Sequence, residues 1–232
     1  MKKDFSKKIL VGITGYKDIH WQRKLREIDK FGITKVALFL ERFDKNQRKR
    51  IYKALLESRI KDIPLVHIRN DMTKEELSFL VKNFGSLYLT IHEDSFNVMQ
   101  KWRGFFKRLY LEMNTDNFIS RKVDVSRIGG FCIDLAHFKV EATKWSKEFI
   151  YIFNRRATKR YFKCNHLNGY SYEKNTDIHF PKKLSDFDYL KTLPKFVFGD
   201  VIALEMDNSI STQLKYKDYI VDILNERFNV KK

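Results

Sequence analysis

The sequence contains few of the residues that mark secreted or modular proteins. It has only 2 cysteines, 3 prolines and 9 glycines in 232 residues. Two cysteines cannot build a disulfide framework and fit a reducing compartment. So little proline and glycine leaves no stretch with the composition of a linker. We therefore expect a single domain that spans residues 1–232.

A targeting signal and long apolar runs are also missing. The chain begins Met1-Lys2-Lys3-Asp4-Phe5-Ser6-Lys7-Lys8, and the apolar run that follows is too short for the core of a signal peptide. No run approaches the ~20 apolar residues that a membrane-spanning helix needs. The sequence thus predicts a cytoplasmic protein without membrane contact, and no feature of it indicates an obligate protein partner.

Acidic residues are scarce relative to basic ones. The chain has 46 Lys and Arg against 29 Asp and Glu, which gives a formal net charge of +17. One interpretation is a polyanionic partner, most simply nucleic acid. The other is a lysine-rich solvated surface without such a partner, because the lysines are scattered along the chain. The charge alone leaves both interpretations open.

What the sequence does have is an alternation of short apolar runs and amphipathic segments. The expected strands cover residues 9–14, 35–40, 63–68, 86–91, 108–111, 130–134, 161–167 and 200–204. The expected helices cover residues 21–31, 44–56, 73–84, 95–106, 141–158, 184–196 and 211–228, and residues 168–183 are expected to form a polar loop. Short apolar runs separated by helices are typical of parallel strands joined by crossovers.

Eight such strands predict an α/β fold closed as a (β/α)8 barrel, a TIM barrel. In that fold the chemistry lies at the carboxyl ends of the strands. An open, doubly wound sheet is the alternative. It is disfavoured because Gly12-Ile13-Thr14-Gly15 lacks the full dinucleotide-binding fingerprint.

Metal-ligating side chains occur where the expected strands end. The strand-end residues with a carboxylate or an imidazole are Glu41, His67, His92, Glu112, Asp134, His166 and Glu205. A barrel would bring these positions into one ring, and clustered histidines and carboxylates are what a divalent metal site requires. For Glu41 we favour a salt bridge with Arg42 or another cation over a role as ligand or base.

The most informative stretch runs from Gly129 to His137. It is a short apolar strand that delivers Asp134 and, three residues later, His137. Because alternate residues of a strand share a face, Cys132 lies below Asp134, and Cys164 lies below the strand-end histidine of the next strand. The two thiols are expected near each other under the site, as buried core residues rather than ligands.

These motifs resemble, in their order along the chain, those of the endonuclease IV family (AP endonuclease family 2), within the xylose isomerase-like barrels. Residues 131–137 resemble its sixth-strand motif, Asn165-His166-Leu167-Asn168 its seventh-strand motif, and Asp177-Ile178-His179 the Asp-x-His that follows. Glu112 and Glu205 resemble the glutamates of its fifth and eighth strands. His67 and His92 fall where the family has histidines on strands three and four.

The resemblance implies up to three divalent ions, usually zinc, with manganese or magnesium as alternatives. One ion would be held by His67, His92 and Glu112, a second by Glu112, Asp134, His166 and Glu205, and a third by His137, Asp177 and His179. It also implies catalytic roles for Glu112, Asp134 and Glu205. The expected activity is the hydrolysis of DNA at abasic or damaged sites, as in DNA repair, because clustered ions activate water and clamp phosphate oxygens.

The chain departs from that family in its length and its brief loops after strands two to five, since the family's loops enter DNA and flip the abasic nucleotide. The segment Ile68–Met72 keeps Arg69 as a possible DNA contact and Met72 as a possible wedge. Related barrels with only the four ligands of the second ion are similar to sugar isomerases and epimerases. A metal-dependent sugar or sugar-phosphate isomerase or epimerase is therefore the second hypothesis. A barrel that has lost its activity is the third.

Overall fold

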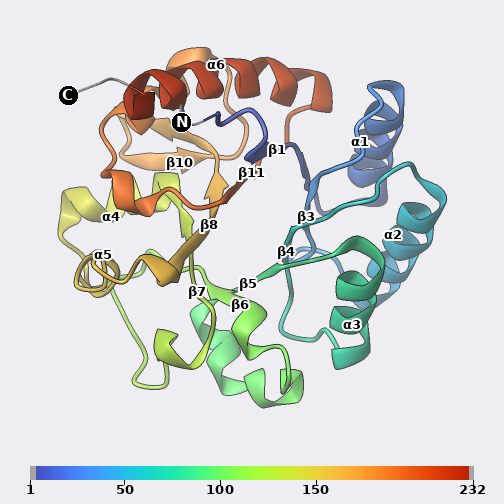
Figure 1. Ribbon diagram of the computed structural model, residues 1–232, viewed down its shortest axis with the longest axis horizontal. Coiled ribbons are helices and arrows are strands. Elements are labelled where there is room, and N and C mark those ends of the chain that lie inside the picture. Colours follow the sequence, from blue (N-terminus) through green and yellow to red (C-terminus); the bar gives the residue numbers. More distant parts are fainter. Residues whose placement is uncertain (1–3, 230–232) are drawn as a thin grey trace.

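The computed structural model describes residues 4–229, so Met1–Lys3, part of the segment that argued against a signal peptide, lies outside the described residues. An all-parallel sheet forms a nearly closed barrel surrounded by helices (Figure 1). Its strands, in chain order, are β1 (Ile9–Leu10), β2 (Gly12–Ile13), β3 (Ala37–Phe39), β4 (Leu65–His67), β5 (Tyr88–Ile91), β6 (Leu109–Leu111), β7 (Gly130–Asp134), β8 (Phe162–Leu167) and β11 (Val201–Leu204).

The sheet has nine strands rather than the expected eight, because the first expected strand is divided at Val11. β1 pairs with β11, whereas β2 pairs with β3. The two edges of the sheet are therefore consecutive pieces of one run of chain. Gly12 permits the close approach at this seam, since a Cβ atom there would lie 2.0 Å from the carbonyl oxygen of Leu204.

The helices lie around the ring of strands. They are α1 (Asp18–Lys30), α2 (Lys45–Glu57), α3 (Lys74–Phe84), α4 (Leu135–Lys144), α5 (Lys147–Phe153) and α6 (Ile210–Asn229). In Figure 1, α1, α2 and α3 lie on one side and α4 and α5 on the opposite side, while α6 runs along the top of the view, near β1 and β11. Within residues 4–229, no helix combines the length and the apolar character that crossing a membrane would require.

Two predicted helix starts are confirmed by their caps. The carboxylate of Asp44 accepts hydrogen bonds from the backbone N–H groups of Asn46 and Gln47 at the start of α2. Thr73 and Glu76 form a reciprocal capping box at the start of α3. These side chains satisfy backbone donors that have no partner within the helix.

The expected long helix over residues 141–158 is wrong, because the chain breaks between α4 and α5. Trp145 adopts the left-handed conformation, with φ of 52°. The hydroxyl of Ser146 then accepts a hydrogen bond from the backbone N–H of Phe149 and caps a new helix. Trp145 is 70% exposed at this break.

The other differences concern segments with weak periodicity. The expected helix over residues 95–106 is a series of short 3-10 turns, η1 (Glu93–Asn97), η2 (Met99–Trp102) and η3 (Phe106–Arg108). The segment 184–196 is likewise 3-10 in η6 (Leu184–Lys191) and η7 (Lys195–Val197), and shorter turns occur at η4 (Val125–Arg127) and η5 (Lys159–Tyr161). The expected loop over residues 168–183 contains an antiparallel hairpin, β9 (Gly169–Ser171) and β10 (Thr176–Ile178).

The strand faces that carry the site residues also carry one buried apolar cluster beneath them. Its members are Leu10, Ala37, Phe39, Leu65, Tyr110, Cys132, Cys164 and Ala203. Cys132 and Cys164 are fully buried and lie opposite each other in the register of β7 and β8. The expectation of two neighbouring buried thiols below the site is thus confirmed.

Candidate metal centre

The carboxyl ends of six neighbouring strands, β4 to β8 and β11, carry a histidine or a carboxylate. The residues are His67 at the end of β4, His92 after β5, Glu112 after β6, Asp134 at the end of β7, His166 in β8 and Glu205 after β11. Parallel strands place these positions on the same rim. All of these side chains are buried except His92, which is half-buried.

Within residues 4–229, potential ligand atoms come within 4.8 Å of one another in three overlapping groups. The groups are His67, His92 and Glu112; Glu112, Asp134, His166 and Glu205; and His67, His166 and Glu205. The first two are the sets that the resemblance implies for two of the ions. They share Glu112, so two positions for an ion lie side by side. The third group was not expected.

The spacing around His67 suits ligands of a common ion better than hydrogen bonds. Its Nδ1 lies 3.6 Å from Oε2 of Glu112 and 3.7 Å from Oε2 of Glu41. Two ligand atoms at ordinary zinc distances on a tetrahedral ion are about 3.4 Å apart, whereas an N–H···O hydrogen bond is usually about 2.9–3.0 Å long. His166 is packed more tightly, with Nδ1 2.9 Å from Glu112 and 3.2 Å from Glu205.

Several buried atoms of this cluster make no hydrogen bond. They are Oε2 of Glu41, both ring nitrogens of His67, Nδ1 of His92, Nδ1 of His137 and Nε2 of His166. Most buried polar atoms have a partner, and an unsatisfied one costs roughly 1–3 kcal/mol. Divalent ions would supply the missing partner to imidazole nitrogens and carboxylate oxygens alike. The residues present therefore fit a metal centre.

Burial and neighbouring charges shift the pKa values of several groups in the cluster. Burial lowers the pKa of His67 to about 3, so its imidazole is neutral and keeps a lone pair for a metal. Burial acts to raise the pKa of Glu112, but the neighbouring His166 outweighs it and holds that pKa well below the usual range. Burial and the charge of Glu205 raise the pKa of Glu41 to about 8.

The residues expected to hold a third ion lie together less compactly. Nε2 of His179 is 3.1 Å from Oδ2 of Asp177, and Nε2 of His137 is 3.8 Å from the same oxygen. They are not among the groups of described residues whose ligand atoms all lie within 4.8 Å. Asp177 belongs to β10, so the hairpin that was expected to be a loop is what brings it to α4 and His137.

Asp134 is oriented by two hydrogen bonds. Its Oδ1 accepts from the backbone N–H of His137 at 2.8 Å and thereby caps α4. Its Oδ2 accepts from Nδ2 of Asn168 at 3.0 Å. The hydroxyl of Tyr189 in turn donates to the backbone carbonyl oxygen of Asn168. The role of Asn168 as an orienting residue was missed, although its place directly after β8 is a signal in the sequence. Such partners fix the geometry of a metal ligand.

Glu41 was expected to make a salt bridge with Arg42, and the structure shows that only one of its oxygens does so. Nε of Arg42 lies 3.6 Å from Oε1 of Glu41, while Oε2 faces His67. Glu41 and His92 both line an open hollow at the rim, together with Arg69 and Asn70. Asp71 and Asp94 also line this hollow, so its lining carries both signs of charge.

The expectation that Met72 acts as a wedge is wrong. Its side chain is fully buried, and its sulfur accepts a hydrogen bond from the backbone N–H of Arg69 at 3.3 Å. The side chain of Arg69 is 42% exposed, and its Nε lies 3.6 Å from Oδ1 of Asp71.

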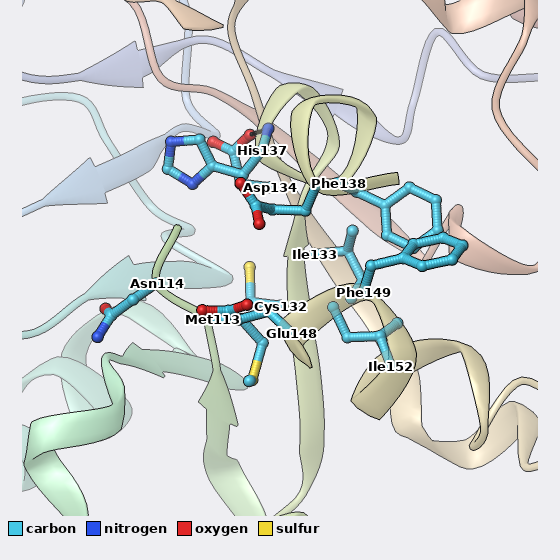
Figure 2. Close-up of a pocket in the computed structure, with 11 residues that line it drawn as sticks. Met113, Asn114, Cys132, Ile133, Asp134, His137, Phe138, Glu148, Phe149 and Ile152 are labelled. Atoms are coloured by element: carbon cyan, nitrogen blue, oxygen red, sulfur yellow. Dashed lines mark hydrogen bonds between the residues drawn. The ribbon is translucent and has the colours of Figure 1, made fainter. Parts of the chain in front are cut away.

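A small cavity of about 20 Å³ lies under Asp134 and His137. Figure 2 shows these two residues at one end, Cys132 and Glu148 below them, and Phe138, Phe149 and Ile152 along one side. A space of that size holds about one water molecule. Oε2 of Glu148 is buried without a hydrogen-bond partner and would give that water a polar contact.

No family model, no curated protein and no solved structure matches the chain. The resemblance to the endonuclease IV family thus rests on the motifs and on the arrangement of their side chains alone.

Proposed function

We propose that the protein is a metal-dependent phosphodiesterase with a xylose isomerase-like (β/α)8 barrel, which hydrolyses DNA at abasic or damaged sites. One observation carries the proposal: two compact ligand groups share Glu112, so two ions could be held next to each other. Adjacent divalent ions, usually zinc, are suited to in-line attack on a phosphodiester because they stabilise both the attacking and the leaving oxygen.

The residues of the chain would have distinct roles in this reaction. Glu112 would bridge the two ion positions, and Asp134 would be a ligand oriented by the N–H of His137 and the amide of Asn168. Glu205 would complete the second position beside His166. Ions bound there would polarise the phosphate and lower the pKa of water. Within this proposal no side chain is needed as the nucleophile.

The remaining ligands and the charge add support for a nucleic acid substrate. His137, Asp177 and His179 lie in contact beside the shared cluster, where a third ion would be placed. The net charge of +17 favours the approach of a polyanion. Arg69 lines the open hollow at the rim.

The test is the incision of a duplex that carries one tetrahydrofuran residue. This reduced abasic analogue cannot undergo β-elimination, so any cut is hydrolytic. We expect the protein loaded with zinc or manganese to cut the strand and the chelator-treated protein to leave it whole, with activity restored by the added ion. A strand that stays intact at stoichiometric loaded protein would rule out the endonuclease.

A second candidate is a divalent-metal-dependent sugar or sugar-phosphate isomerase or epimerase. One observation favours it: Glu112, Asp134, His166 and Glu205 form a fully buried compact group. The residues implied for a third ion, His137, Asp177 and His179, do not form such a group. Such an enzyme needs one or two ions rather than three. It would leave the tetrahydrofuran strand whole and interconvert an aldose and a ketose, or two epimers, which can be followed by chromatography.

A further inference from the structure

Glu41 follows β3 and belongs neither to the three ligand sets that the resemblance implies nor, among the described residues, to the groups whose ligand atoms all lie within 4.8 Å of one another. Its two carboxylate oxygens have different surroundings. Oε1 lies 3.6 Å from Nε of Arg42 at the edge of the rim. Oε2 is buried and has no hydrogen-bond partner. One oxygen thus has a cation beside it, while the other is left unpaired within the cluster.

The surroundings of His67 indicate the role of the unpaired oxygen of Glu41. This side chain is 2% exposed, and neither of its ring nitrogens has a hydrogen-bond partner. Its Nδ1 lies at nearly equal distances from two carboxylates, 3.6 Å from Glu112 and 3.7 Å from Glu41. Both distances are too long for a good hydrogen bond and close to the spacing of two ligands on one tetrahedral ion, about 3.4 Å.

We propose that Glu41 is a metal ligand, whose Oε2 would help to hold an ion beside Nδ1 of His67. The inference rests on the proposed metal centre and extends it to a residue outside the implied sets. An added carboxylate makes the position richer in oxygen, and oxygen-rich sites suit manganese and magnesium better than sulfur- or nitrogen-rich ones do. Because Glu41 and His92 line the same open hollow, this ion would be the one nearest to the solvent.

The test measures bound metal rather than activity. Wild type, Glu41→Gln and Glu173→Gln are loaded with manganese or with zinc, dialysed exhaustively and analysed for metal content, and the affinity is measured by competition with a chelator. Glu173 lies exposed between β9 and β10, so its variant controls for the loss of one negative charge near the rim. We expect Glu41→Gln to lose one ion or to bind it at least about tenfold more weakly, and Glu173→Gln to match wild type.

Folding is monitored by circular dichroism and by the melting temperature of the metal-free proteins. Metal-free Glu41→Gln should melt no lower than wild type, because burial already disfavours the charged form of Glu41 and the amide carries no charge. If it fails to fold, Glu41→Asp keeps the charge but withdraws the oxygen by one methylene, and it should show the same weakened binding.

The outcomes separate this inference from the proposed function. If wild type holds more than one ion and Glu41→Gln holds them with unchanged affinity, Glu41 is not a ligand and the metal centre stands without it. If wild type itself retains no ion, the metal centre and the role of Glu41 are both overturned. An equal loss in both glutamine variants would assign the effect to general charge and would also overturn the inference.

Discussion

At the scale of single residues, one buried ion pair ties the helices beside the rim together. Arg48 of α2 is fully buried, and its Nε donates to Oε1 of Glu76 at 2.9 Å. Its Nη1 also donates to Asp71 and to the carbonyl oxygen of Phe43. Since Glu76 caps α3 as well, the pair joins α2 and α3 behind the loop that presents Arg69.

Glu76→Ala should destabilise the protein by about 3–5 kcal/mol, because it leaves the buried Arg48 without its main partner. Glu75→Ala is the matched control, since Glu75 is exposed on the same turn, and it should change stability by no more than about 0.5 kcal/mol. Urea unfolding of both variants measures the difference. Similar midpoints for the two variants would contradict this role of the pair.

The pH dependence of the same pair has a definite sign. Burial acts to raise the pKa of Glu76, but the hydrogen bond from Arg48 outweighs it, and the pKa falls below its ordinary value of 4.5. A carboxyl group whose pKa is lower in the folded state stabilises the protein above its unfolded pKa, and this contribution is lost as the pH falls through the folded value. The difference in the free energy of unfolding between wild type and Glu76→Ala should therefore become smaller below about pH 4.

The gathering of histidines and carboxylates at the strand ends could be predicted, because a parallel sheet places all these positions on one rim. The two oxygens of Glu41 could not be told apart in this way. Its neighbour Arg42 correctly indicated a salt bridge, yet the direction of the second oxygen depends on the packing of His67 from another strand. Residues adjacent in sequence indicate local pairs, whereas the site is made of pairs distant in sequence.

At the scale of elements, the alternation of apolar and amphipathic segments predicted most of the barrel. The expected strand over residues 130–134 coincides with β7, and the caps at Asp44 and Thr73 start α2 and α3. The break at Trp145 was missed because apolar spacing continues across it, while the cap at Ser146 interrupts the backbone. The hairpin of β9 and β10 was missed because its segment is polar and its position depends on packing against α4.

Asp134 caps α4 and is also an expected metal ligand, and two substitutions separate these two roles. Asparagine caps helices as well as aspartate does, whereas alanine costs about 1 kcal/mol at such a position. Metal-free Asp134→Asn should therefore be at least as stable as wild type, and Asp134→Ala less stable than Asp134→Asn by about that amount. Both should bind fewer ions, because neither offers a carboxylate, and metal analysis with thermal unfolding measures both effects.

The side-chain amide of Asn168 can adapt to Asp134→Asn, so the two substitutions at Asp134 can be compared directly. In wild type, Nδ2 of Asn168 donates to Asp134, and the buried Oδ1 of Asn168 has no partner. A rotation of that amide would present Oδ1 to the new NH2 group of Asp134→Asn, so the substitution need not bury two facing donors. If Asp134→Asn kept the full metal content of wild type, Asp134 would not be a ligand.

At the scale of the whole molecule, an alternating pattern predicted a barrel, and the structure shows a nearly closed parallel sheet. The division of the first strand at Val11 could not be predicted, because it results from pairing with β11 on one side and β3 on the other. The surplus of positive charge is also a property of the whole surface. Whether this charge directs DNA to the site depends on whether cations near the rim contribute more to DNA binding than cations elsewhere.

The salt dependence of duplex DNA binding tests that question. Each phosphate contact releases counterions, so the logarithm of the binding constant should fall linearly with the logarithm of the salt concentration, by about 0.9 per contact. Arg69→Gln should flatten this slope by roughly one contact, because Arg69 stands at the hollow beside the ligand cluster. Lys35→Gln is the control: it removes an exposed cation just before β3, at the opposite end of the barrel, and should leave the slope unchanged.

The three possible results have different physical meanings. A steep slope that only Arg69→Gln reduces would mean that DNA lies across the rim where the ligands are. A steep slope that both variants reduce equally would mean that the cations attract DNA without directing it to the cluster, which would contradict the expected binding mode. A flat response in wild type would show that the +17 charge serves the solvated surface alone, and the substrate of the cluster would then have to be small.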